Sequence, residues 1–312
     1  MPDDATPPPG NPPRKPAALV LRSTMPRIKV EGNIVKILPA RLVLRDAESI
    51  DRAHDDITRG RLAYARHVLP TLLKLYPLDF DIIEAQARLF DAEDAHEQAI
   101  KFLDEHVEKF FKFLETTAGR RDGLIIPYSH KENMPFIGCL FKLGLYSWYK
   151  LKDEAALGYF KKLLEVDPSD PKGARYFILH LAIGLERFDD ASMVASKIGR
   201  DELQALFAGG SNRTLFGLLY GLGLLVFVLG DLPGAMTMLE YAIKSNPHAL
   251  ANLLEDPRFD HGPVDHVVKQ YGSGASEQEG RGYVDDWGDV WDSYPGSLEF
   301  LLLVAGGMAK RR

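Results

Sequence analysis

The feature that most constrains the fold of this chain is a stretch that occurs twice, at a fixed offset of 79 residues (223 − 144 = 79). The first copy runs from Leu140 to Pro168 and the second from Phe216 to Pro247. The matched positions, which keep this offset without slippage, are Gly144 with Gly223, Ala156 with Ala235, Phe160 with Leu239, and Pro168 with Pro247.

Each copy has the pattern of two amphipathic helices joined by a turn. In the first copy, apolar side chains from Ala156 to Leu164 recur at the spacing of a helix that is buried on one side. Lys152 and Asp153 interrupt the apolar run, and Pro168 ends the unit because proline has no backbone N–H to donate. Small residues in both helices let them approach closely, so the sequence predicts a repeated helical hairpin.

This pattern resembles the tetratricopeptide repeat, a helix–turn–helix unit of about 34 residues with small residues near its middle and a terminal proline. Leu140 and Leu219 stand where that repeat usually has tryptophan, and Ser147 and Val226 stand where it usually has tyrosine. The resemblance implies an all-α solenoid of stacked hairpins, whose first helices line one concave surface.

Further units extend the array. Residues 46–115 predict repeats 1 and 2, with Pro77 closing the first, and residues 135–255 predict repeats 3 to 5, so we expect about five hairpins. Residues 116–134 contain glycines and a proline and are predicted to be a loop that interrupts the array. The fourth unit, from Lys172 to about Ala205, has no closing proline.

The N-terminal part has a different composition. Residues 1–22 are predicted to be a disordered, proline-rich tail, and they lack the apolar core of a secretory signal. Residues 23–45 are predicted to be a short β-hairpin or extended segment, because Ile28 and Val30 alternate with charged residues before a Gly32–Asn33 turn. Such a hairpin could cover the open end of the helical stack.

The C-terminal part, residues 256–312, predicts a loop followed by capping helices. The stretch from Phe259 to Gly282 is rich in glycine and charge and is interpreted as a loop. Trp287 and Trp291 are four residues apart, so on a helix they share a face, which we expect to pack onto the last repeat. The apolar stretch from Pro295 to Met308 predicts a last, capping helix.

The C-terminal block carries a second resemblance. Asn246-Pro247-His248 and Leu253-Leu254 are followed by Tyr271-Gly272-Ser273-Gly274, then by Trp291 and by Pro295-Gly296-Ser297-Leu298. This order is similar to the end of a little-characterised group of repeat proteins in bacteria and plants, and to the end of the suppression-of-tumorigenicity family in animals. The resemblance implies a helical-repeat scaffold and no established catalytic activity.

Composition narrows the class of protein. The 312-residue chain is 46% hydrophobic, has a formal net charge of −6, and contains one cysteine, Cys139. A single cysteine forms no disulfide within the chain, so we expect a reducing, cytoplasmic location. The acidic balance argues against a general nucleic-acid binder, and we predict no nucleic-acid partner.

Motifs for catalysis or cofactor binding are absent from the sequence. There is no glycine-rich dinucleotide or phosphate loop, no zinc-protease motif and no nucleophile elbow. Cys139 has no partner nearby in the sequence and is interpreted as a small buried residue. We therefore predict no enzyme activity and no cofactor.

One polar cluster leaves a second function open. In the stretch from Asp260 to His266, the side chains of His261, Asp265 and His266 are weak candidates for metal ligands, because imidazole and carboxylate groups both bind transition metals. Their spacing matches no closed metal site. The alternative is therefore a metal-binding or hydrolytic protein that uses this loop.

A third function would depend on the membrane. The longest apolar run, from Leu215 to Leu229, is about 15 residues, whereas a spanning helix needs about 20. The repeat register also predicts that this run forms a buried first helix. We expect no membrane span. The other alternative function is that of a membrane-associated protein, anchored through residues 215–229.

The concave surface is the predicted binding site. If successive first helices are in register, their equivalent positions form an aromatic and apolar groove, made of Phe141, Leu145, Trp148, Tyr176, His180, Tyr220, Leu224 and Phe227. An apolar groove binds a helix or an extended peptide of a partner, or it is filled by the chain itself. The segment from Ser297 to Val304 is apolar enough to fill it. The sequence therefore predicts a non-enzymatic scaffold that binds a protein or peptide partner.

Overall fold

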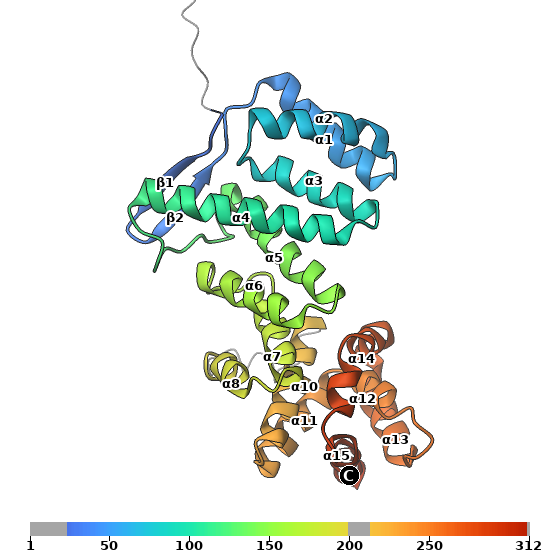
Figure 1. The fold of residues 1–312 in the computed structure, drawn as a ribbon. Coiled ribbons are helices and arrows are strands. Elements are labelled where there is room, and N and C mark those ends of the chain that lie inside the picture. The colour runs from blue at the N-terminus through green and yellow to red at the C-terminus, as the bar shows by residue number, and fades with distance from the viewer. Residues whose placement is uncertain (1–23, 199–212, 311–312) are drawn as a thin grey trace, which may run out of the picture.

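The computed structural model describes residues 24–198 and 213–310, and most of them lie in helices that stack as hairpins (Figure 1). The predicted tail, residues 1–22, lies outside the described residues. So does the predicted end of the fourth unit, from residue 199 to about residue 205.

Within residues 24–198 and 213–310, five helical hairpins follow one another in chain order, the number that the sequence predicts. They are α1 (Leu44–Thr58) with α2 (Leu62–Leu75), α3 (Phe80–Ala92) with α4 (His96–Ala118), α5 (Met134–Tyr149) with α6 (Asp153–Val166), α7 (Ala174–Gly184) with α8 (Phe188–Ser196), and α10 (Arg213–Val228) with α11 (Leu232–Ser245). Each hairpin packs on the next, and the chain descends through the array in order (Figure 1). The predicted fold class, an all-α solenoid of helical hairpins with a short β-hairpin, is confirmed.

The residues that match at the 79-residue offset make equivalent packing contacts in the two hairpins. A Cβ atom added to Gly144 would lie 2.8 Å from the ring of Phe160 in the second helix of its hairpin. A Cβ atom added to Gly223 would overlap with Leu239, the residue that the offset pairs with Phe160. Both hairpins therefore close at the same point, because a glycine in the first helix leaves room for one large side chain from the second.

The register continues into the turns that end the two hairpins. Asp167 and Asn246 are both buried, and each uses its side-chain Oδ1 to accept a hydrogen bond from the backbone N–H two residues later, on Ser169 and His248 respectively. The donor distances are 3.2 and 3.1 Å. A short polar side chain before the closing proline thus turns the chain out of the helix and towards the next unit.

The β-hairpin lies against the side of the array and not over its end. Strands β1 (Arg27–Glu31) and β2 (Ile34–Leu38) pair antiparallel, with Val30 opposite Val35. The hairpin packs near α4, while the pair α1 and α2 occupies the end of the array (Figure 1). The predicted cap is therefore wrong in its position, because β1 contacts α4 and β2 contacts η1 (Lys131–Asn133), the 3₁₀ turn before α5.

The predicted loop at residues 116–134 is shorter and more ordered than expected. Helix α4 continues to Ala118, and a 3₁₀ turn, η1 (Lys131–Asn133), precedes α5. Between them, Ile125 forms a parallel bridge with Ile34, and the N–H of Ile126 donates to the carbonyl of Val166 at 2.7 Å. The segment ties the β-hairpin to α6, so it connects the array where we expected an interruption.

The stretch from Phe259 to Gly282, predicted as a loop, is largely helical. It contains α13 (Gly262–Tyr271), the 3₁₀ turn η2 (Gly272–Gly274) and the first turn of α14 (Glu277–Asp292). Val264 and Val267 of α13 are buried, which supplies the stabilisation that its glycine-rich flanks do not suggest. Helix α12 (Pro247–Leu253) precedes this stretch, and the predicted capping helix is α15 (Ser297–Lys310).

The core has two parts. One continuous cluster of buried apolar side chains runs from the β-hairpin and α3 to α15. A second, smaller cluster lies among α1, α2 and the face of α3 that contains Ile82 and Leu89. Helix α3 therefore contributes to both clusters and joins the first hairpin to the rest of the molecule.

Candidate protein-binding site

The predicted groove residues lie on the first helices of three successive hairpins. Helix α5 provides Phe141, Leu145 and Trp148, α7 provides Tyr176 and His180, and α10 provides Tyr220, Leu224 and Phe227. Those of α7, together with Tyr220 and Leu224, are buried, and the other four are half-buried. The register of the hairpins thus brings the residues onto a common wall, but most of that wall is already covered.

Helix α14 is what covers it. The ring of Trp287 stacks on Trp148 with centroids 4.9 Å apart and planes 12° apart, and it stacks on His180 at 4.7 Å. Further along the same helix, Tyr283 lies 5.3 Å from Tyr220, between ring centroids. The aromatic face of α14 therefore fills the groove across α5, α7 and α10.

This corrects one expectation about which segment fills the groove. The sequence favoured Ser297–Val304, but α15 packs on α11 and α13. Its Phe300 lies 5.1 Å from the predicted groove residue Phe227, between ring centroids. Helix α14 has the larger aromatic side chains, spaced to lie on one face. Trp287 and Trp291 share that face, as predicted, and it packs on the repeats.

A chain of hydrogen bonds fixes α14 on α7. His180 Nδ1 lies 2.8 Å from the carbonyl of Tyr176, which can only accept, so Nδ1 carries the proton and Nε2 accepts. Tyr283 O–H donates to that Nε2 at 3.2 Å and accepts from the indole N–H of Trp291 at 3.0 Å. The indole N–H of Trp287 donates to the hydroxyl of Tyr176 at 2.6 Å.

The network requires a neutral imidazole. His180 is fully buried, and this burial lowers its pKa from 6.5 to about 4, against a smaller opposing effect of the Tyr176 carbonyl. A protonated Nε2 could no longer accept from Tyr283. The polar contacts between α14 and α7 are therefore complete at neutral pH.

An open pocket remains beside α14, where the wall is not covered. It has a volume of about 290 Å³ and lies among α5, α7 and the middle of α14. Its lining includes four predicted groove residues, Phe141, Leu145, Trp148 and Tyr176, together with Tyr149, Phe177, Lys172 and Asp286. We call this cavity the aromatic pocket.

The aromatic pocket offers ring faces with one charge of each sign. Phe177 stands edge-on to Phe141, with centroids 5.8 Å apart, and Tyr149 stacks on Trp148 at 5.1 Å. Lys172 Nζ lies 5.9 Å from the centre of the Phe141 ring. A cavity of this size, at the lower end of binding-pocket volumes, suits one large apolar side chain with polar backbone on either side.

Sequence reasoning missed half of this lining. Phe177 directly follows Tyr176 and was not among the predicted groove positions; its ring stacks on Phe160 of α6, the second helix of the preceding hairpin, with centroids 4.5 Å apart. Tyr149 is the last residue of α5, and at a helix end the helical period does not predict which way a side chain points. Asp286 belongs to α14, whose place in the groove was not predicted.

The polar loop gives no support to the metal-binding alternative. His261 precedes α13, while Asp265 and His266 lie in its first turns. Among the described residues, no group of three or more histidine, cysteine, aspartate or glutamate side chains is arranged to hold a metal ion. The carboxylate of Asp260 instead accepts a hydrogen bond from the N–H of Gly262 at 3.0 Å.

The apolar run from Leu215 to Leu229 lies mostly in α10, which packs between α7 and α11. No helix within the described ranges is both long enough and apolar enough to cross a bilayer.

Cys139 lies in α5 and is completely buried. Its thiol faces the carbonyl of Phe80 at 3.8 Å, and burial raises its pKa well above 9.0. A thiol in that state is not a nucleophile, because the thiolate is the reactive form.

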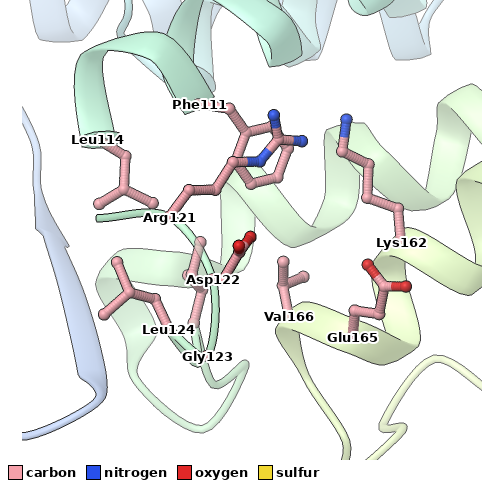
Figure 2. Close-up of a pocket in the computed structure, with 10 residues that line it drawn as sticks. Phe111, Leu114, Arg121, Asp122, Gly123, Leu124, Lys162, Glu165 and Val166 are labelled. Carbon is pink, nitrogen blue, oxygen red and sulfur yellow. The ribbon is translucent and has the colours of Figure 1, made fainter. Parts of the chain in front are cut away.

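A separate cavity of about 420 Å³ lies between the end of α4, the segment after it and α6 (Figure 2). Figure 2 shows Arg121 and Lys162 beside the ring of Phe111, at 4.3 and 4.4 Å from its centre, with the carboxylates of Asp122 and Glu165 facing the same space. The two basic and two acidic side chains balance, so the cavity favours neither an anion nor a cation.

Several solved structures match this chain, and two of them are described here. BtubC (BKLC) from P. vanneervenii shares 13% sequence identity with a TM-score of 0.38, covering 86% of this chain and 94% of that chain. PilF from Pseudomonas aeruginosa shares 15% identity with a TM-score of 0.41, covering 83% of this chain and 96% of that chain. At these TM-scores neither structure bears on function.

No curated protein matches the chain. The similarity of the C-terminal block to the bacterial and plant repeat group and to the suppression-of-tumorigenicity family stays a prediction. A family model described as transcriptional repressor TCF25 matches residues 70–292, from α2 to the end of α14. Since this match spans well over half of the 312 residues, the chain belongs to that family.

Proposed function

We propose that this chain is a non-enzymatic scaffold that binds a protein partner by taking an apolar side chain of an extended partner segment into the aromatic pocket. The observation that supports this proposal is the pocket itself, which stays open while α14 covers the rest of the wall. Aromatic rings on rigid helices bind apolar side chains at little cost in conformational entropy.

The family suggests the process in which this scaffold acts. Its description names a transcriptional repressor, and repression by a helical-repeat protein is compatible with holding other proteins together. We therefore propose a regulatory assembly as the setting. The predictions of a cytoplasmic location and of no nucleic-acid partner belong to the same proposal, and cell fractionation and a DNA-binding assay test them directly.

Two pocket variants test the site, and circular dichroism of each checks that its helices stay intact. Leu145→Glu places a charge in the pocket, and Tyr149→Ala removes a ring that is 62% exposed. Tyr176 and Tyr220 are unsuitable for this purpose because they are buried under α14. Leu303→Glu is the matched control, since Leu303 is an apolar residue on α15 that is 59% exposed.

The measurement is quantitative mass spectrometry of proteins that co-purify with each tagged chain, followed by direct binding of the best candidate to the purified variants. We expect both pocket variants to lose the same partner, by at least about tenfold in affinity, since a hot-spot side chain contributes about 2 kcal/mol or more. Leu303→Glu should keep the partner. An unchanged partner set in both pocket variants, with circular dichroism showing intact helices, contradicts the proposal.

A further inference from the structure

The β-hairpin has two outer edges, and the described residues close the edge of β2. There the N–H of Val35 donates to the carbonyl of Ile125 at 2.8 Å, and the N–H of Ile37 donates to Oδ1 of Asn133 at 2.9 Å. The side chain of Asn133, which is completely buried, also donates to the carbonyl of Val35 at 2.8 Å. These outward groups of β2 are thus satisfied by the segment that leads into α5.

The outer edge of β1 carries the matching groups without partners. In an antiparallel pair, two residues directly opposite each other point their N–H and C=O groups either towards each other or both outwards. Val30 lies opposite Val35 and Ile28 lies opposite Ile37, so the backbone groups of Ile28 and Val30 point outwards. None of them forms a hydrogen bond to any residue that the structure describes. Such an edge can pair with a further strand.

The edge of β1 is also open to a partner. Although β1 contacts α4, each of its residues except Ile28 is exposed, and Val30 is 38% exposed. Opposite side chains of a strand pair lie on the same face, and on this face Val35 and Ile37 of β2 are buried. The apolar face of the hairpin is therefore covered on β2 and open on β1, where a third strand would extend it.

The charges on the other face decide which strand fits. Arg27 and Lys29 lie there on β1, and Lys36 of β2 lies directly opposite Lys29. Glu31, the one acidic residue of the two strands, lies 2.6 Å from Lys29 Nζ and 3.3 Å from Lys36 Nζ. The two strands therefore keep an excess of positive charge. A second copy of β1 would be repelled by these lysines, whereas an acidic strand would be attracted.

We propose that β1 binds an extended segment of a protein partner as a third strand, and that in this segment apolar residues alternate with aspartate or glutamate. Backbone hydrogen bonds to Ile28 and Val30 hold the strand, which is a recurring way for a sheet to bind a peptide. Because side chains alternate between the faces, its apolar residues lie beside Val30 and its carboxylates lie beside Lys29. The site shares no residue with the aromatic pocket, so it is independent of the function proposed above.

The test uses a short peptide with capped ends, in which valine and glutamate alternate, titrated into the full chain at low salt and followed by NMR. We expect a dissociation constant on the order of 0.1 mM, and downfield shifts of the amide signals of Ile28 and Val30 as new hydrogen bonds form. A peptide with lysine in place of glutamate should bind at least about tenfold more weakly, because the edge is basic.

Two further peptides test strand pairing itself. One is N-methylated on its valines and the other on its glutamates, so both keep the charges while each loses the N–H groups along one edge. One of the two should bind at least about tenfold more weakly than the parent peptide, because only one edge of a bound strand faces β1.

Variants of the chain locate the binding. Val30→Pro removes an outward N–H and leaves the bonds between β1 and β2 in place, and Lys29→Glu reverses the charge on the other face. Each should weaken binding of the alternating peptide at least about tenfold. Val30→Thr, which keeps the N–H, and Lys74→Glu, at the end of α2, are the matched controls and should each change binding by less than about threefold.

The amide signals of Val35 and Ile37 check that the hairpin stays folded in each variant. If Val30→Pro unfolds it, the peptide series and Lys29→Glu decide the outcome. The proposal is overturned if the wild-type chain does not bind the alternating peptide, if both N-methylated peptides bind as well as the parent, or if Lys29→Glu binds like the wild type.

Discussion

At the scale of single residues, two glycines set how closely the hairpins close. Gly144 and Gly223 each face a large side chain from the partner helix at a distance that admits no Cβ atom. Both positions require a residue without a side chain, so both are glycine. This holds although glycine weakens a helix by about 1 kcal/mol relative to alanine.

The first prediction concerns Gly223→Ala. We expect it to lower the free energy of unfolding by about 1 to 3 kcal/mol, because the added methyl group overlaps with Leu239 in a filled core. Gly158→Ala is the matched control, since Gly158 lies inside α6 with no atom within 4 Å of an added Cβ. That control should be neutral or stabilising by up to about 1 kcal/mol. Urea denaturation of both variants checks the difference, and equal effects would refute it.

At the scale of elements, the decisive contact is α14 against the first helices of three hairpins. It buries Tyr283, Trp287 and Trp291 and satisfies their polar atoms through the His180 network. A helix with a mostly charged outer face and this aromatic inner face folds stably only where such a surface is available. The groove is therefore covered because the aromatic face of α14 and the apolar wall of the hairpins match each other.

The second prediction is that mild acid weakens this contact. The pKa of His180 in the folded state, about 4, lies below its ordinary value of 6.5, so the unfolded chain binds the extra proton first as pH falls. The contribution of His180 to stability is present above pH 6.5 and is lost as pH falls towards 4, a change of about 3 kcal/mol.

Intrinsic fluorescence reads this change directly, because Trp148, Trp287 and Trp291 are the three tryptophans of the chain and all lie at the α14 interface. Urea denaturation is followed by tryptophan emission at pH 7 and pH 5. We expect the change in the free energy of unfolding between these two pH values to be less favourable in wild type than in His180→Gln, which cannot gain the proton, by about 2 kcal/mol. Asp79, whose pKa is raised, shifts stability in the opposite direction in both chains alike. Equal pH dependence of the two chains would rule out the assignment to His180.

At the scale of the whole molecule, the two apolar clusters divide the array unevenly. The large cluster joins everything from α3 to α15, whereas the small one holds α1 and α2 onto one face of α3. Segments with fewer buried apolar contacts open at lower free energy than the global unfolding of a protein. We therefore expect the first hairpin to open at lower free energy than the hairpins that belong wholly to the large cluster.

The third prediction follows from this division. In hydrogen exchange followed by mass spectrometry, peptides from α1 and α2 should exchange faster than those from α5, α7 and α10, while α3 should follow the slower group because it belongs to both clusters. The comparison is made within one sample, so the slow helices are the control. Equal exchange rates in all of these helices would contradict the prediction, because they would show that the two clusters unfold together.

The sequence by itself determined the hairpins, their register and the wall that they share. The period of apolar side chains, the glycines that admit one large partner side chain, and the closing prolines are local demands, so they can be read along the chain. The aromatic faces of the first helices and of α14 were visible in the same way, although the sequence assigned the groove to Ser297–Val304.

Only the tertiary structure decided where these faces meet. Whether α14 or α15 enters the groove depends on the competing surfaces of α11 and α13, which no local pattern encodes. The same holds for the side on which the β-hairpin packs and for the helix α13, whose valines gain their stabilisation from distant residues. The pockets arise where separate elements leave space between them, and such space is a property of packing in three dimensions, not of any one segment.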